Sequence, residues 1–333
     1  MTAQPGFDPR PGMRLVLLAC LPGLLALLWQ YGCGTLVQLA IAIPTALAGE
    51  ALVRRLCSQR IAPTEALFGL APLAEGGALV TAVLLALALP PYAPWWLALC
   101  ASACAILLGK SLFGGFGHNP FNPAMLGFAL ALLAFPAHFT HWPAAGQVHG
   151  PWGALQQVFG FGSGLVDGWS QATVLDTLRH NDRLTIDELF AGHGAFGGVG
   201  GHGAEWVNLA FLAGGLILLQ QKVIRWHAPV GMLAALFVAA LLCWNGSGSD
   251  SNGSPLLHLF SGATMLGAFF IVTEPVSGPA SDRARLLFGA GAGLLVYGIR
   301  TWGGYPDGLA FAVLAMNLLV PTLERVAARG VRP

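Results

Sequence analysis

Residues 95–112 read WWLALCASACAILLGKSL, and this stretch decides the fold class because Lys110 is its only charged residue. A helix of that length crosses the hydrocarbon core of a membrane, which is about 30 Å thick. Nine further stretches have the same apolar character. The ten stretches cover roughly residues 13–31, 34–52, 76–90, 95–112, 122–138, 206–221, 228–245, 256–273, 284–300 and 307–323. The sequence therefore predicts an all-α integral membrane protein with about ten transmembrane helices.

The composition supports a membrane location. Hydrophobic residues make up 55% of the chain and charged residues only 9%, whereas charged residues supply about a quarter of a soluble domain. A lipid bilayer is therefore the first partner that the sequence predicts. No basic cluster of the kind that binds nucleic acid occurs in the sequence, so no nucleic acid is expected as a partner. The six cysteines lie mostly within or beside apolar stretches, where cysteine packs as a small hydrophobic residue, and we predict no metal site.

The charges that flank the ten stretches predict an orientation. Lys and Arg are enriched on the cytoplasmic side of transmembrane helices. With the N-terminus inside, 13 of the 16 basic residues fall on the inner side, and only Arg179, Arg183 and Arg300 fall outside. An even number of spans returns the C-terminus to the inner side. We therefore predict cytoplasmic termini and a periplasmic loop over residues 139–205.

That loop divides the chain into two membrane halves, residues 1–138 with five spans and residues 206–333 with the other five. A connection of such length is usually functional or disordered. The loop is rich in glycine and holds most of the acidic residues of the outer side. It is therefore the predicted place for a bound or covalently attached group.

The two halves end alike, since Lys110–Ala131 reads KSLFGGFGHNPFNPAMLGFALA and Arg300–Asn317 reads RTWGGYPDGLAFAVLAMN. Each runs from a basic residue through Gly-Gly and a proline turn into a helix of small residues. Because five spans precede each end, the halves would be inverted relative to one another, and inverted repeats place binding sites near the membrane midplane at discontinuous helices. The alternative is that glycine and proline merely mark two loops.

Polar residues near the spans are candidates for binding and for ion movement. Asn119 and Asn122 each precede a proline, which forces extended backbone, and their amides can bond freed backbone groups or the polar edge of a ligand. Ionisable residues close to a membrane span are functional candidates, and here they are Glu50, Glu75, Lys110, His258 and Glu274. For Glu75, an ion-pathway role and a helix-cap role are both open. The case for Lys110 is weaker, because a lysine at a helix end can extend its side chain towards the membrane surface.

Four motifs carry a resemblance to a known family. GKSLFGGFGHNPFNPAMLGF (109–128), DGWSQATVLDT (167–177), HLFSGATMLGAFFIVTEPV (258–276) and RTWGGYPDGLAFAVLAMNLLVP (300–321) resemble the D subunits of Rnf complexes and, more distantly, the NqrB subunits of sodium-pumping NADH:quinone oxidoreductases. The resemblance covers nearly the whole chain. It implies a ten-helix subunit of an ion-translocating ferredoxin:NAD oxidoreductase in the bacterial inner membrane, coupled to transport of Na⁺ or H⁺.

The same resemblance implies a cofactor and partners. The family carries FMN joined through its phosphate to a threonine, and a second flavin or riboflavin held without a covalent bond. The implied partners are an iron–sulfur subunit, an NADH-binding subunit, a second FMN subunit and a flavin transferase. The family's acceptor pattern, Asp-x-x-Ser/Thr-x-Ala-Thr, matches Asp167, Ser170, Ala172 and Thr173, so Thr173 is the predicted acceptor.

A second threonine competes with this assignment. Ser261 to Thr264 repeat the core of the pattern, but no aspartate stands six residues before Thr264. Thr264 also falls inside the eighth apolar stretch, which a transferase reaches only if the helix is broken. We therefore interpret Thr264 as a helix-contact or flavin-pocket residue. Gln171 and Val174 depart from the residues usual in the family, and neither change removes the nucleophile.

Two further hypotheses remain at the level of sequence. A ten-span inverted repeat also suits a non-redox channel or small-solute transporter, because fold does not fix function. A pure scaffold for partner subunits is the other alternative. Covalent flavin on the denatured chain would distinguish an electron-transfer subunit from a channel, and loss of activity in Thr173→Ala would argue against a scaffold.

Overall fold

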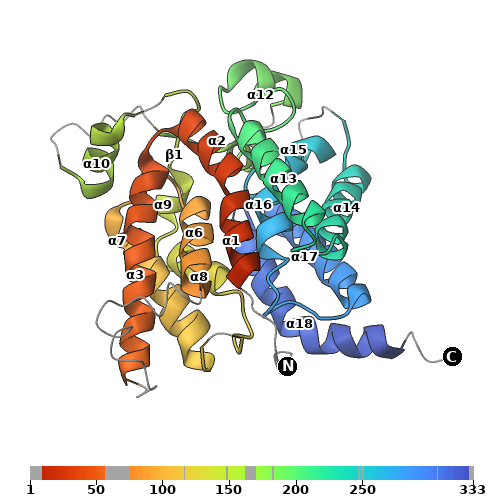
Figure 1. Cartoon of the computed structure of the whole chain (residues 1–333). Coiled ribbons are helices and arrows are strands. Elements are labelled where there is room, and N and C mark those ends of the chain that lie inside the picture. Colours follow the sequence, from red (N-terminus) through yellow and green to blue (C-terminus); the bar gives the residue numbers. More distant parts are fainter. Residues whose placement is uncertain are drawn as a thin grey trace.

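The chain is predominantly helical in the computed structural model, which describes residues 10–56, 76–115, 117–147, 149–161, 170–181, 184–246, 248, 251–305 and 307–329. The named strands in this part of the chain form one two-residue pairing, so the predicted all-α class holds. Figure 1 shows helices running side by side, with α10 (Pro151–Phe159) and α12 (Ile186–Gly192) at one end of the bundle. The C-terminal part of α18 (Leu309–Arg329) lies at the other end.

The described helices fit a membrane protein by length and composition. Four helical segments are long and apolar enough to cross a bilayer, namely Pro11–Tyr31, Gly34–Leu56, Trp95–Phe113 and Leu309–Arg329. Four shorter apolar helices accompany them, namely Gly77–Ala88, Pro123–Ala134, Ala204–Gln220 and His227–Leu242. Large apolar side chains such as Leu25 and Leu318 are more than half exposed on these helices, as lipid contact requires.

The N-terminal half consists of helices that follow the first five apolar stretches. They are α1 (Arg10–Ala19), α2 (Leu21–Tyr31), α3 (Gly34–Leu56), α6 (Gly77–Ala88), α7 (Trp95–Cys104), the π-helical turn η1 (Ala105–Lys110), the 3₁₀ turn η2 (Ser111–Phe113) and α8 (Pro123–Ala134). Asn122 caps α8, because its side chain accepts the Met125 N–H at 3.0 Å, and Pro123 fits the first helical position, where no N–H is needed.

The segment between the halves holds short elements. They are α9 (Ala137–Thr140), β1 (Trp142–Pro143), α10, β2 (Ser170–Gln171), α11 (Val174–Arg179) and α12. Strand β1 pairs antiparallel with β2, so that Trp142 faces Gln171 and Pro143 faces Ser170. This pairing holds the end of the first membrane half beside the predicted acceptor segment.

The C-terminal half follows the last five apolar stretches. Its elements are α13 (Ala204–Gln220), α14 (His227–Leu242), α15 (Pro255–Leu259), α16 (Thr264–Leu266), the π-helical turn η3 (Gly267–Ile271), α17 (Asp282–Trp302) and α18. The eighth stretch is not one helix, contrary to the expectation from its apolar character. Helix α15 ends at Leu259 and α16 begins at Thr264, with Gly262 at φ +60° between them. A glycine tolerates that left-handed conformation without a Cβ clash.

Lys110 differs from its expected position. Instead of extending to the membrane surface, it is 3% exposed, and its Nζ lies 2.7 Å from Glu50 Oε1 on α3. Arg54, one turn further along α3, lies 2.9 Å from the same oxygen. Burying a cation such as Lys110 is costly unless a carboxylate compensates it, and Glu50 supplies one negative charge beside Lys110 and the partly buried Arg54.

Helices α14 and α17 approach closely through glycines. A Cβ at Gly293 on α17 would overlap the carbonyl oxygen of Met232 on α14, and one at Gly289 would overlap the Ala228 carbonyl. Small residues permit this kind of close helix packing in membranes. A Cβ at Gly298, on the same helix, would have only Trp302 at 4.0 Å.

We predict that Gly293→Ala destabilises the protein while Gly298→Ala does not. The added methyl group at position 293 must push α14 and α17 apart, and overpacking of this kind costs about 1–3 kcal/mol. Gly298→Ala adds the same group on the same helix with space around it. Thermal unfolding in one detergent measures both, and equal melting temperatures for the two variants would contradict the proposed packing.

Candidate functional site

Thr173 is held in place by the residues that follow it. Its backbone is extended, and its Oγ1 accepts the Asp176 N–H at 3.3 Å as the N-cap of α11. Val174 and Leu175 are both buried, in a small apolar cluster that also contains Leu257. The buried pair anchors the segment to the C-terminal half, and β2 anchors it to the N-terminal half.

A cavity of about 340 Å³ adjoins Thr173. Its walls come from both membrane halves and from the loop, and they are mostly apolar, with aromatic groups from Phe128, Trp142, Phe211 and Tyr305. The volume lies in the range of small-molecule pockets, which are concave and largely apolar with a few polar groups. Polar and charged residues in the wall are Thr140, Gln171, Thr173, Asp176, Arg179, His180, His202, Asn208 and Asp307.

The break in the eighth stretch forms part of this wall through Gly262 and Ala263. Two elements bond the backbone groups that the break frees. Asn208 on α13 donates to the Gly262 carbonyl at 3.0 Å and accepts the Met265 N–H at 3.0 Å. Ser261 Oγ accepts the Gly201 N–H at 3.0 Å. Irregular backbone at membrane depth survives only where such partners are available.

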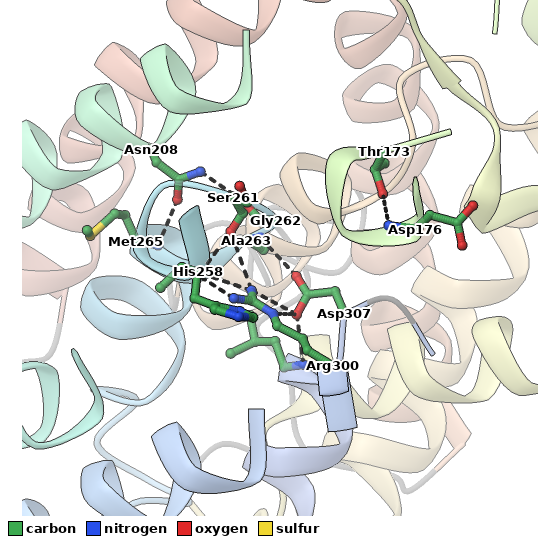
Figure 2. A network of polar contacts seen from close by, with 12 residues as sticks. Thr173, Asp176, Asn208, His258, Ser261, Gly262, Ala263, Met265, Arg300 and Asp307 are labelled. Carbon is green, nitrogen blue, oxygen red and sulfur yellow. Dashed lines mark hydrogen bonds and ion pairs between the residues drawn. The ribbon is translucent and has the colours of Figure 1, made fainter. Parts of the chain in front are cut away.

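Arg300 bonds the same break from the other side (Figure 2). Its guanidinium donates to the carbonyl oxygens of His258 at 2.8 Å and Ser261 at 3.4 Å, and to Thr264 Oγ1 at 2.9 Å. The Thr264 hydroxyl is fully buried, and its single hydrogen lies between two acceptors, the His258 carbonyl at 2.9 Å and the Ser261 carbonyl at 2.8 Å. The side chain of Arg300 is only 1% exposed. Its charge therefore requires a partner inside the protein.

Asp307 provides that partner. Its Oδ1 lies 3.2 Å from Arg300 Nη2, and its Oδ2 accepts the Ala263 N–H at 2.9 Å. The Leu309 N–H also points to Oδ1 at 3.3 Å. The Asp307 side chain is 27% exposed and lies in the cavity wall. A buried cation and a carboxylate at the cavity surface are thus joined directly.

Arg179 contributes a second positive charge to the wall. It is the last residue of α11 and lines the cavity. Its Nη1 is buried, and no described residue offers it a hydrogen-bond partner. A buried, unpaired guanidinium nitrogen is unfavourable unless a ligand meets it, and the guanidinium group matches the geometry of phosphate and carboxylate groups particularly well.

The comparison with known proteins agrees with the four sequence motifs. Residues 6–331 match the family described as NQR2, RnfD, RnfE. The chain belongs to this family. A protein of Ectopseudomonas mendocina, named as the D subunit of an ion-translocating oxidoreductase complex, is 61% identical over 312 residues, which cover 94% of this chain and 88% of the relative.

Other relatives carry the same name. The protein of Pseudomonas aeruginosa strain LESB58 is 59% identical over 312 residues, covering 94% of this chain and 88% of the relative. The protein of Klebsiella pneumoniae strain 342 is 46% identical over 335 residues, covering 94% and 91%. The NQR2, RnfD, RnfE family is thus shown over nearly the whole chain, which confirms the resemblance.

The structure brings together some of the residues predicted for a site in this family. Ala172 and Thr173 line the cavity, and Ser170 lies beside them in β2. Thr264 lies directly behind Ala263 of the wall, and its hydroxyl faces Arg300. Asp167 and Glu75 lie outside the described residues.

Asn119 and Asn122 lie elsewhere. Asn122 donates its side-chain N–H to the Ile271 carbonyl at 3.3 Å, and its backbone N–H to Asn317 Oδ1 at 3.0 Å. Asn119 Nδ2 lies 3.4 Å from Glu274 Oε1. These contacts hold the turn before α8 against the far end of η3 and the middle of α18, away from the wall residues Gly262 and Asp307.

Sequence reasoning missed the roles of Arg179, Asn208, Arg300 and Asp307. One signal was available, because Arg179 and Arg300 are two of the three basic residues assigned to the outer side. An arginine on the outer side, where few basic residues lie, is a candidate for a specific partner or function. Nothing in the residue pattern identifies that partner as Asp307 or a ligand.

Proposed function

We propose that the chain is the membrane subunit of an ion-translocating ferredoxin:NAD oxidoreductase complex, and that it carries FMN as a phosphoester of Thr173. Its relatives are named as the D subunits of ion-translocating oxidoreductase complexes, which supports a subunit that is not catalytic alone. The single observation that carries the cofactor assignment is the apolar cavity with the Thr173 side chain in its wall. The coupled cation is Na⁺ or H⁺.

The residues present fit a flavin phosphoester. A hydroxyl in the wall supplies the attachment point, and aromatic and aliphatic side chains offer a surface for a planar ring. Arg179 Nη1 is a buried donor without a partner among the described residues, and an anionic phosphate or a ring carbonyl would satisfy it. The tether leaves the ring free to lie against the cavity wall.

Attachment requires a separate transferase. The Thr173 oxygen forms the new bond to phosphorus while the pyrophosphate bond of the flavin donor breaks. The hydroxyl proton passes to a base, and a nucleoside monophosphate is the leaving group. Thr173 is only partly buried, whereas Thr264 is fully buried and bonded to three groups. This difference supports Thr173 as the acceptor.

In the working protein, a bound flavin supplies electron transfer between partner subunits. The chain's own residues position and enclose it. Aromatic residues from both halves exclude water from the cavity, and Asn208 and Arg300 hold the broken eighth stretch in the shape that forms its wall. An iron–sulfur subunit, an NADH-binding subunit and a second FMN subunit complete the electron path, and a second flavin or riboflavin binds without a covalent bond.

We also propose ten spans in an inverted five-plus-five arrangement in the bacterial inner membrane. The packing supports this, because α3 contacts α7 in the first half as α14 contacts α17 in the second. Likewise α7 contacts α8 as α17 contacts α18. Both halves place a buried cation, Lys110 or Arg300, near the end of the fourth helix and pair it with a carboxylate.

The orientation has a direct test. Tags at both termini should be accessible only from the cytoplasm, and a tag near Gly194 only from the periplasm, because basic residues flank the spans on the inner side. Reporter fusions to alkaline phosphatase and green fluorescent protein measure the side. A periplasmic C-terminus would show that the number of spans is odd.

The cofactor assignment is tested by intact mass of the purified chain after co-expression with the flavin transferase. We expect the mass of the polypeptide plus FMN less one water. The denatured chain should also fluoresce as a flavin in a gel. A bare polypeptide under these conditions would contradict the proposal and would favour a non-redox channel or a scaffold.

A further inference from the structure

We propose that Arg300 and Asp307 form an electrostatic positioning pair that sets the reduction potential of the flavin in the cavity. The proposal rests on the proposed function, because it requires a flavin on Thr173. It assigns a role to two residues that the attachment chemistry does not use. Both residues are positioning residues and not catalytic groups, since they act on the flavin through their charge.

The geometry places the two charges at different depths. Asp307 lies in the cavity wall with a 27% exposed side chain, whereas the Arg300 side chain is 1% exposed. Arg300 is not itself part of the wall; it lies behind the wall, bonded to the His258 and Ser261 carbonyls of the broken stretch. A ligand in the cavity therefore meets the carboxylate first and the guanidinium behind it.

The position of both charges is fixed. Asp307 is bonded by Arg300, by the Ala263 N–H and by the Leu309 N–H. Arg300 is bonded by two carbonyl oxygens and by the Thr264 hydroxyl. A charge held in place by this many bonds acts on a ligand without first having to reorient, which makes its effect larger than that of a mobile surface charge.

A redox change in the cavity must respond to these charges. Reduction of a flavin bound there would place additional negative charge in the cavity. The Asp307 carboxylate disfavours that added charge, and the Arg300 guanidinium favours it. In a protein interior, a unit charge within several ångströms of a flavin would change the ratio of reduced to oxidised flavin by on the order of tenfold.

Other ionisable groups also line the cavity and contribute to the potential of a bound flavin. Asp176 and Arg179 come from α11, His180 directly follows that helix, and His202 comes from the turn before α13. Asp176 Oδ1 lies 3.3 Å from His180 Nδ1. These groups lie on other elements than Arg300 and Asp307, and they stay unchanged in variants of the pair, so their effect is constant in a comparison.

The test measures the reduction potential of the covalent flavin in the assembled complex, by dithionite titration with redox dyes in neutral buffer. We expect Asp307→Asn to raise the potential, because it leaves the positive charge of Arg300 uncompensated. We expect Arg300→Gln to lower it, because the carboxylate then acts alone. Each shift should correspond to about a tenfold change in the reduced-to-oxidised ratio, or about 59 mV for one electron.

Two controls separate charge from structure. Asp307→Glu keeps the charge and should restore the wild-type potential if the complex assembles. Asp282→Asn removes a carboxylate that is also paired with arginines, Arg225 and Arg285, at the opposite end of α17. It lies about 27 Å from Arg300 along the helix axis, so the potential should not move.

The outcomes are distinct. Opposite shifts in Asp307→Asn and Arg300→Gln support the pair, because a purely structural role would not reverse sign. If Arg300→Gln fails to assemble, a raised potential in Asp307→Asn together with a normal one in Asp307→Glu supports it as well. Unchanged potentials, or shifts of the same sign, with flavin still on Thr173 overturn it. Absence of covalent flavin from the wild-type chain instead refutes the proposed function.

Discussion

Thr173→Ala is expected to abolish covalent flavin on the chain. The substitution removes the hydroxyl that lines the cavity and accepts the Asp176 N–H. Loss of the N-cap also costs about 1 kcal/mol, which is small beside the packing of Val174 and Leu175, so the chain should still fold. Intact mass should show the bare polypeptide, and electron transfer through the complex should be lost.

Two threonines provide matched controls. Thr185 caps α12 in the same loop, where its hydroxyl accepts the Glu188 N–H at 3.3 Å, and it is not among the cavity residues. Thr185→Ala removes a comparable cap and should leave the flavin in place. Thr264→Ala should also retain it. A flavin mapped by peptide mass to Thr264 would contradict the assignment, since the buried Thr264 hydroxyl would have to leave its bonds to Arg300 and the His258 carbonyl.

The fold class could be predicted from sequence because apolar length is a local property. A stretch such as 95–112 has too few charges to be exposed to water over its whole length, and helix formation satisfies its backbone without any partner. Each of the ten apolar stretches accordingly contains described helix, although the eighth is interrupted around Gly262. The number of spans and the inverted repeat stay predictions, because residue spacing alone does not place a helix in a bilayer.

The break in the eighth stretch could not be predicted from its own residues. HLFSGATMLGAFF has glycines of the kind that helices often tolerate, and nothing in it demands a turn at Gly262. The groups that stabilise the break come from Asn208, Arg300 and Asp307, which lie 36 to 57 residues away along the chain from the atoms they bond. Long-range bonding of this kind becomes visible only in the folded chain.

The candidate site shows the same limit. Thr173 could be proposed as the acceptor because the family pattern is local, and the structure places this residue in a cavity wall. Its role as the acceptor stays a prediction. The cavity itself joins both halves and the loop, so its volume and its charged residues depend on tertiary packing. Lys110 illustrates the converse, because a helix-end lysine usually reaches the membrane surface, and only the position of Glu50 shows why this one does not.

Asn122→Leu is expected to destabilise the protein and to impair coupled electron transfer. Asn122 is 1% exposed and bonds three groups, the Met125 N–H, the Ile271 carbonyl and Asn317 Oδ1. Leucine keeps the bond from the backbone N–H and loses the two that the side chain makes. Each buried polar group left without a partner costs about 1–3 kcal/mol, so the total should reach several kcal/mol.

This variant should still carry flavin on Thr173. Asn122 is not a wall residue, and of the three residues that it bonds only Met125 lines the cavity. Its contact with α18, at Asn317, is about 12 Å along the helix from Leu309 of the wall. Loss of coupling with the flavin retained would place Asn122 at the ion path or at a non-covalent flavin.

Asn181→Leu is the control, because the Asn181 side chain also bonds two backbone groups, both of Leu184, but these bonds are exposed. Thermal unfolding, flavin fluorescence and ion uptake into proteoliposomes measure the three effects. Full coupled activity with a wild-type melting temperature in Asn122→Leu would contradict the prediction, because it would show that the two buried side-chain bonds are dispensable.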